Sequence, residues 1–211
     1  MVKALVVIGV VLVVALIGVA YWFYVYSGDL PNLDQFALFA PDQRRVAEDP
    51  CSHLSVTAIP ASEMNKWVRA AITVDEAPPT DPEFAWNVAF NQASCNFPSG
   101  WQIISKAKRL SGHLKKRFTP EQLLAIDLNT HRFGFRTVGI EAVAQQKFSK
   151  PARELELQEA ALLFLEPGYE DEKPDLLLQK RNTFMDTMAA QHLITTEEAA
   201  TAKAQPLPST K

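Results

Sequence analysis

The chain has 211 residues, of which 47% are hydrophobic and 21% charged, and its formal net charge is −3. This composition is typical of a globular protein and excludes a wholly disordered chain. The absence of a basic excess also argues against nucleic acid as a partner.

Residues 4–26 contain no charged side chain. At about 1.5 Å per residue, a helix of this length crosses a hydrocarbon core of about 30 Å. A cleavable signal peptide is the alternative, but its apolar stretch usually has about 7–15 residues. Aromatic residues that suit a membrane interface gather near the end of the segment, at Tyr21, Trp22, Phe23, Tyr24 and Tyr26. We therefore expect residues 1–27 to be an uncleaved, single-pass transmembrane anchor.

The charges that flank this segment predict its orientation. Lys3 precedes it, whereas Asp29 and Asp34 follow it and no basic residue comes before Arg44. The positive-inside rule then places the N-terminus in the cytoplasm. We expect an inner (cytoplasmic) membrane protein whose body, residues 28–204, is periplasmic or extracellular. In such a body Cys51 and Cys95 could form a disulfide, or both could be small buried apolar residues.

The body is predicted to be mainly helical. We expect an extended linker over residues 28–50, a short strand over 54–59, a helix over 62–74 and a proline-rich loop over 77–82. Thr119-Pro120-Glu121-Gln122 predicts a helix start with a capping box, and Thr195 with Glu198 predicts another. Residues 155–165 are apolar on nearly every face, which favours a buried helix, and 175–193 also look helical. Residues 205–211 should form a disordered tail.

One stretch, residues 84–120, contains no Asp or Glu. It is either a solvated basic helix face or a face that binds phosphate or anionic lipid headgroups. The basic residues concerned are Lys106, Lys108, Arg109, Lys115, Lys116 and Arg117.

Asp75 and Glu76 form the only acidic pair that suggests catalysis. One of two adjacent carboxylates can act as a general base when burial raises its pKa. A solvated helix end is the simpler interpretation. Gly-rich phosphate loops, nucleophile elbows and paired metal-binding histidines are absent from the sequence, and no zinc-ligand spacing occurs.

Residues 123–144 read LLAIDLNTHRFGFRTVGIEAVA. This string resembles the family-51 glycosyltransferases, the peptidoglycan polymerase domains of penicillin-binding proteins and monofunctional transglycosylases, whose pattern is approximately ILxxYLNxxxFGxxxxGxEAAA. Asp127 stands where that family prefers Tyr. The similarity continues over residues 148–150, 155–163 and 194–199. The matching motif residues include Asn129, Phe133, Gly134, Gly139 and Glu141.

The resemblance implies a lysozyme-like, membrane-bound domain that polymerises lipid II during cell-wall biogenesis. Its general base would be a glutamate in the motif EDxxFxxHxG. A second glutamate, in KxxE, would assist at the donor pyrophosphate together with basic residues and often a divalent metal. The matching motif residues should serve packing: we expect Gly139 at a position closed to a Cβ and Asn129 to satisfy buried backbone groups.

The catalytic motifs depart from the family pattern. Asp75 aligns with the base and Glu76 with the Asp after it, so the pair is inverted, and the Phe, His and Gly of that motif are missing. The second motif survives at best as residues 99–104, and Ala107 stands where the KxxE glutamate would be.

Two functions remain open. The first is a divergent glycosyltransferase in which Asp75 or Glu76 is the base and Lys106, Lys108 or Arg109 holds the pyrophosphate, with a divalent metal if catalytic. The second is a non-catalytic relative that binds lipid-linked precursor, glycan or envelope proteins. A lytic hydrolase is a third alternative, but it needs two carboxylates that flank the scissile bond, and only the acid pair could supply them.

Overall fold

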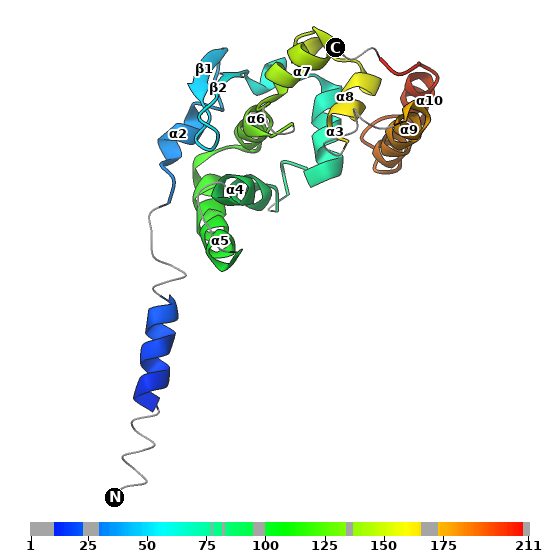
Figure 1. Ribbon diagram of the computed structural model, residues 1–211. Helices are drawn as coiled ribbons and strands as arrows, with labels where there is room; N and C mark the ends of the chain where they lie inside the picture. Colours follow the sequence, from blue (N-terminus) through cyan, green and yellow to red (C-terminus); the bar gives the residue numbers. More distant parts are fainter. Residues whose placement is uncertain are drawn as a thin grey trace, which may run out of the picture.

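The computed structural model describes residues 11–22, 30–76, 78–81, 83–94, 100–133, 137–165 and 173–208, with the backbone alone at positions 75, 76 and 94. Most of these residues lie in helices, and a small two-stranded sheet lies at one edge of the body (Figure 1). The expectation of a mainly helical body is thereby confirmed.

The body begins with a short helix and a hairpin and continues with helices. The elements are α2 (Leu33–Ala37), β1 (Arg45–Glu48), β2 (Ser55–Ala58), α3 (Lys66–Glu76), α4 (Phe84–Ser94), α5 (Gly100–Arg117), α6 (Pro120–Thr130), α7 (Ile140–Phe148), α8 (Leu157–Leu163), α9 (Pro174–Ala190) and α10 (Thr196–Lys203). Short 3₁₀ turns cover Ala61–Glu63 and Ala152–Glu154.

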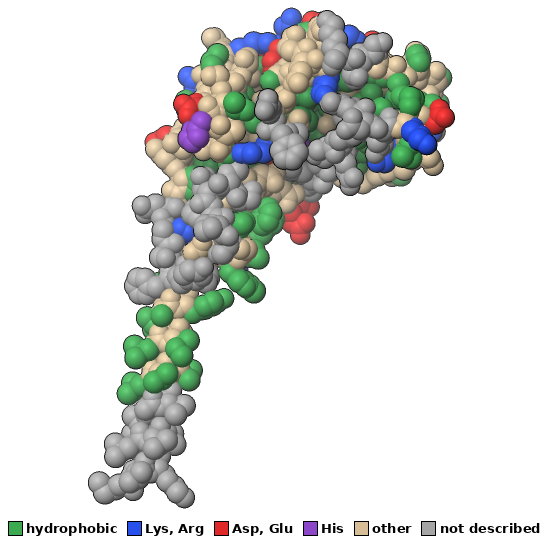
Figure 2. All heavy atoms as spheres, in the orientation of Figure 1, with side chains coloured by type: hydrophobic (Ala, Val, Ile, Leu, Met, Phe, Trp, Pro, Cys, Tyr) green, Lys and Arg blue, Asp and Glu red, His purple; other side chains and the backbone are tan. Residues whose placement is uncertain are grey.

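Residues 11–22 form a separate helix whose side chains are all exposed (Figure 2). In the described part of the chain, no helix is long and apolar enough to cross a membrane. Much of the expected anchor, at residues 1–10 and 23–29, lies outside the described residues.

Two helix starts follow the capping signals of the sequence. At α6, the Thr119 hydroxyl accepts from the Gln122 N–H at 3.2 Å, and the Gln122 side chain accepts from the Thr119 N–H at 3.0 Å. At α10, Thr195 and Glu198 make the same reciprocal pair. Each pair satisfies N–H groups that would otherwise lack partners in the first helical turn, so both predicted starts are confirmed.

The prediction of an extended linker over residues 28–50 was wrong. The segment contains α2, which begins after Asn32, and β1, which pairs antiparallel with β2 so that Val46 faces Thr57. The Asn32 side chain caps α2 by accepting the Asp34 N–H at 2.9 Å. The predicted strand over 54–59 corresponds to β2, and β1 provides the partner that its backbone groups require.

The helices share one hydrophobic core with the buried face of the hairpin. α4 and α5 pack along each other, and α3 packs against α8 and α9. The predicted buried helix over 155–165 is α8, and the one over 175–193 is α9. α3 begins at Lys66, later than the predicted position 62, because residues Ala61–Glu63 form a 3₁₀ turn.

Candidate functional site

The acid pair lies in the last turn of α3. Only the backbone of Asp75 and Glu76 is described, and residue 77 of the following loop lies outside the described residues. α3 itself packs against α8 and α9. The catalytic role of the pair therefore stays a prediction.

The basic residues of the acid-free stretch do not share one environment. Lys106 on α5 is 2% exposed, and the neighbouring Ala107 is 0% exposed. Lys108, Lys115 and Lys116 are exposed, whereas Arg109 is half-buried. Arg117 pairs with Asp34 in the first turn of α2. The structure thus brings three of the six candidates, the exposed lysines, to the surface of α5 without an ion pair to a described acid, and it places Lys106 in the interior.

Exposed apolar side chains accompany these lysines. Trp101 is 67% exposed and Ile104 44% exposed, and both lie on the α5 face that also carries Lys108 and Lys115, because these positions differ by three, four and seven residues. Phe90 on the neighbouring α4 is also exposed. We call Phe90, Trp101, Ile104, Lys108 and Lys115 the α4–α5 face. It combines apolar and basic groups as surfaces at membrane interfaces do.

Asn129, near the end of α6, ties three segments together inside the core. Its Oδ1 accepts from the Ile59 N–H at 3.0 Å, and its Nδ2 donates to the carbonyls of Ile59 at 2.8 Å and Phe39 at 2.9 Å. The side chain is completely buried. Asn129 therefore satisfies backbone groups that water cannot reach, and the prediction of a packing role is confirmed.

Gly139 precedes α7 with a φ of +90° and a ψ of 139°, a conformation open essentially to glycine alone. A Cβ there would lie 2.9 Å from Val56 Cγ1 and 3.0 Å from the Asn129 carbonyl oxygen. The prediction of a position closed to a Cβ is thereby confirmed. Gly134, another motif residue, lies outside the described residues.

The Glu141 carboxylate is buried and hydrogen-bonded to two other segments. Its carboxylate accepts from the Ala152 N–H at 2.9 Å and from Arg44 Nη1 at 2.9 Å, while Arg44 Nε also pairs with Glu63 at 2.5 Å. These contacts connect the start of α7 to the hairpin and to the turn before α8. Both glutamates raise the pKa of Arg44, Glu63 most strongly. Glu141 is 5% exposed, and its contacts are those of a packing residue.

Phe133 belongs to an aromatic cluster that sequence reasoning missed. The His131 ring lies 4.7 Å from the Phe133 ring and 5.7 Å from the Phe164 ring, and the two phenylalanine rings are 5.6 Å apart. Burial lowers the pKa of His131 to about 4. The residue is therefore neutral at physiological pH. The sequence shows His131 and Phe133 close together in the chain, but it does not indicate that Phe164 packs against them.

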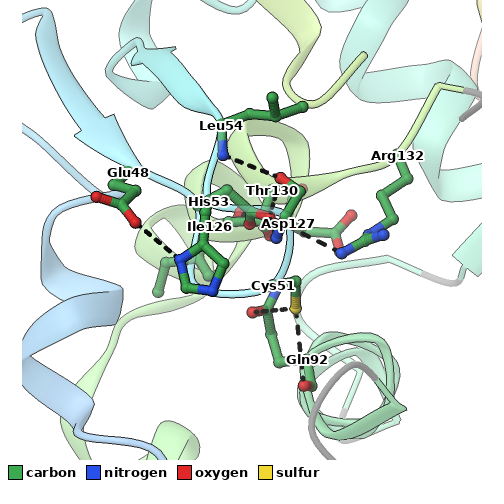
Figure 3. Close-up of polar contacts among 11 residues, drawn as sticks. Glu48, Cys51, His53, Leu54, Gln92, Ile126, Asp127, Thr130 and Arg132 are labelled. Atoms are coloured by element: carbon green, nitrogen blue, oxygen red, sulfur yellow. Dashed lines mark hydrogen bonds and ion pairs between the residues drawn. The ribbon is translucent and has the colours of Figure 1, made fainter. Parts of the chain in front are cut away.

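A buried carboxylate organises the turn between β1 and β2, the turn that carries Cys51 and His53 (Figure 3). Asp49 is 0% exposed, and its Oδ2 accepts from the Ser52 N–H at 2.7 Å and the Ser52 hydroxyl at 2.6 Å. Arg132, which follows α6, brings Nη2 to within 3.8 Å of the same oxygen. The Asp-Pro-Cys-Ser turn was the sequence signal for this arrangement.

Cys51 in the same turn is disulfide-bonded and lies against Gln92 of α4. The sequence has one other cysteine, Cys95, which is outside the described residues. Of the two alternatives for Cys51, a disulfide or a small buried apolar residue, the structure has the disulfide.

Among the described residues, no group of three or more His, Cys, Asp or Glu side chains is arranged to hold a metal ion. The side chains of Asp75 and Glu76 are outside that set.

In a comparison with known protein families, residues 102–189 match the family model described as Transglycosylase. That range contains α6, α7 and α8 and nearly all of α5 and α9, and it begins after the acid pair. No curated protein matches the chain. Among solved structures, penicillin-binding protein 1A from Haemophilus influenzae is similar with 21% identity and a TM-score of 0.38, over 59% of this chain and 17% of that one. The family match confirms the resemblance that the motif between Asn129 and Glu141 indicated. Residues 102–189 are similar to the transglycosylases of family 51.

Proposed function

We propose that the protein is a peptidoglycan glycosyltransferase-like membrane protein of cell-wall biogenesis with a lysozyme-like body, which binds lipid II or the glycan strand. The match of residues 102–189 to the transglycosylase family supports this function. The packing of Asn129, Gly139 and Glu141 supports it too, because these motif residues make contacts that keep the body folded.

Within this function we propose that glycosyl transfer is absent or strongly reduced. Asp is one methylene shorter than Glu, so Asp75 in the base position would fall short of the acceptor hydroxyl by about 1.5 Å. A displacement of about 1 Å can lower the rate on the order of a hundredfold. Glu76 has the required length, but on a helix it points about 100° away from position 75. Ala107, fully buried, supplies no carboxylate where the family has one.

The test is polymerisation of fluorescent lipid II by the full-length protein in detergent, with lipid II binding measured in parallel. We expect binding with little or no polymer. Strong polymerisation that is lost in an Asp75→Ala/Glu76→Ala variant with an unchanged circular dichroism spectrum would favour the active enzyme instead. Failure to bind either lipid II or glycan strands would contradict the proposed function itself and leave envelope proteins as the partners to test.

We also propose that residues 4–26 anchor the protein in the cytoplasmic membrane with the body outside the cytoplasm. The uncharged length of this segment supports the anchor, and the α4–α5 face would contact lipid headgroups beside it. The protein should then resist extraction by salt and carbonate and keep its N-terminus. Extractable protein, or a mature N-terminus after Tyr26, would contradict the anchor.

The orientation of the body has a matched test. Ile104 on α5 and Leu176 on α9 are similarly exposed, 44% and 45%. Each is replaced by Cys in the full chain, labelled with an environment-sensitive dye and placed in anionic vesicles. Emission should shift to the blue at position 104 and stay unchanged at position 176, with the unsubstituted chain as the labelling blank. Equal emission at both positions would contradict contact of the α4–α5 face with lipid.

A further inference from the structure

A pocket of about 460 Å³ opens between the N-terminus of α3 and the connection from α9 to α10. This volume falls in the range of small-molecule sites, about 300–1,000 Å³. Its apolar lining is formed by Trp67, Ala189, Leu193 and Ile194, and its polar lining by Lys66, His192, Thr195, Thr196 and Glu198. The pocket lies at the opposite end of α3 from the acid pair, nine residues or about 14 Å along the helix.

An ammonium group already occupies part of this pocket, and it belongs to the protein. Lys66 Nζ lies 3.9 Å from the centroid of the Trp67 ring and 2.8 Å from Glu198 Oε1. An aromatic face and a carboxylate are the two groups that recognise an ammonium ion in protein sites. The Lys66 side chain therefore shows where an external cation would be held.

The two sides of this contact differ in rigidity. Glu198 Oε2 also accepts the Thr195 N–H at 2.8 Å, so the capping box of α10 fixes the carboxylate. The contacts with Lys66 and then with Thr195 lower the pKa of Glu198, so the carboxylate remains charged at neutral pH. Lys66, by contrast, is 68% exposed on a flexible stem, and exposed ion pairs of this kind are weak. The lysine can leave while the receptor groups stay.

We propose that this pocket binds a primary ammonium group on an aliphatic stem, such as the lysine side chain of a peptide, and that Lys66 fills the site when the ligand is absent. The ligand's ammonium would take the position of Lys66 Nζ between Trp67 and Glu198. Its methylene stem would lie along Leu193 and Ile194. The inference is independent of glycosyl transfer and of the acid pair.

Competition with Lys66 gives the proposal a distinctive signature. Lys66→Ala removes the internal competitor and should tighten binding about tenfold, the combined size of an exposed cation–π contact and an exposed ion pair. Glu198→Gln should weaken binding by a similar factor. Gln also serves at this position of a capping box, so α10 should keep its start. A pocket with only a structural role would not bind more tightly after loss of Lys66.

The experiment is a titration of the full-length protein in detergent, followed by nuclear magnetic resonance of the Trp67 indole, assigned with a Trp67→Phe variant. The probe is Nα-acetyl-lysine N-methylamide, and the uncharged control is the norleucine analogue. We expect saturable shifts with the lysine probe only, tighter in Lys66→Ala and weaker in Glu198→Gln. 1,5-Diaminopentane separates the two sources of the ammonium: stronger binding of the peptide probe supports a peptide ligand, and stronger binding of the diamine supports a free amine.

Three results would overturn the proposal. Equal binding of the norleucine analogue would show an apolar groove without ammonium recognition. Unchanged or weaker binding in Lys66→Ala would show that Lys66 does not compete for the site. Absence of saturable shifts in both the wild type and Lys66→Ala, with circular dichroism spectra that show folded protein, would show that the pocket does not take this ligand.

Discussion

Replacing Gly139 by alanine should destabilise the protein strongly, because two separate costs add at this position. Adopting a φ of +90° costs a residue with a Cβ about 1–3 kcal/mol. The new methyl group would also lie 3.0 Å from the Asn129 carbonyl oxygen and 2.9 Å from Val56 Cγ1. Val56 can turn its side chain, but the carbonyl is fixed at the end of α6, and such overpacking costs about 1–3 kcal/mol. We expect the free energy of unfolding to fall by about 2–6 kcal/mol, and by more in Gly139→Val.

The assay is urea unfolding of the purified protein in detergent, followed by circular dichroism, which gives the midpoint and the slope. Gly112 supplies the matched control, because it is exposed within α5 and nothing lies within 4 Å of its Cβ position. Gly112→Ala should raise the free energy of unfolding by about 0.5–1 kcal/mol, the usual helix preference of alanine over glycine. Equal midpoints for Gly139→Ala and the wild type would refute the packing account, and a loss in Gly112→Ala would remove the control.

Three further changes test the interior. Asn129→Ala leaves the Ile59 N–H and the Ile59 and Phe39 carbonyls without their partner. Urea unfolding should therefore show a free energy of unfolding lower by about 3–5 kcal/mol. An unchanged midpoint would contradict the three hydrogen bonds of Asn129. Burial lowers the pKa of His131 to about 4 from an ordinary value of 6.5, so the unfolded chain binds the proton first as the pH drops. The free energy of unfolding should therefore fall by about 3 kcal/mol between about pH 6.5 and pH 4. His131→Phe should flatten this dependence, and an identical pH profile in the variant would exclude His131 as its source. Buried Arg181 donates to the carbonyl of Lys203 at the end of α10 and to those of Gln205 and Pro206 just after it, so the expectation of a disordered tail was wrong for these two residues. Arg181→Lys should speed hydrogen exchange in α10, because an ammonium cannot reproduce the planar fork; unchanged exchange would contradict this role.

The parts of the fold that were predictable have short-range causes. A capping box involves residues three apart, so Thr119 and Thr195 could be identified from the chain alone. Burial of α8 follows from its apolar composition on nearly every face. The roles of Asn129 and Gly139 needed the family resemblance, because their partners are far away in the chain. Asn129 contacts the backbone of Phe39 and Ile59, and Gly139 lies against the Val56 side chain.

The parts that were missed depend on contacts between distant segments. β1 has one buried residue, Ala47, so its sequence carries little alternation, and its strand character depends on pairing with β2. Likewise, a run of basic residues does not reveal which of its side chains faces the core. Lys106 and Lys108 are two residues apart, and one is buried while the other is exposed, as the helical period requires once α4 covers one side of α5.

The burial of Lys106 and Ala107 also bears on the proposed loss of glycosyl transfer. A group that contacts a pyrophosphate must be reachable from a substrate cleft, yet both of these residues are closed off within the body. A glutamate at position 107 would place a carboxylate in the interior, which is costly unless a charged or hydrogen-bonding partner meets it. Alanine at this position instead joins the hydrophobic core with Leu110 and Leu114. Position 107 of α5 therefore serves packing, and the basic side chains of α5 that an anionic substrate could reach are the exposed ones, which include Lys108 and Lys115 of the α4–α5 face.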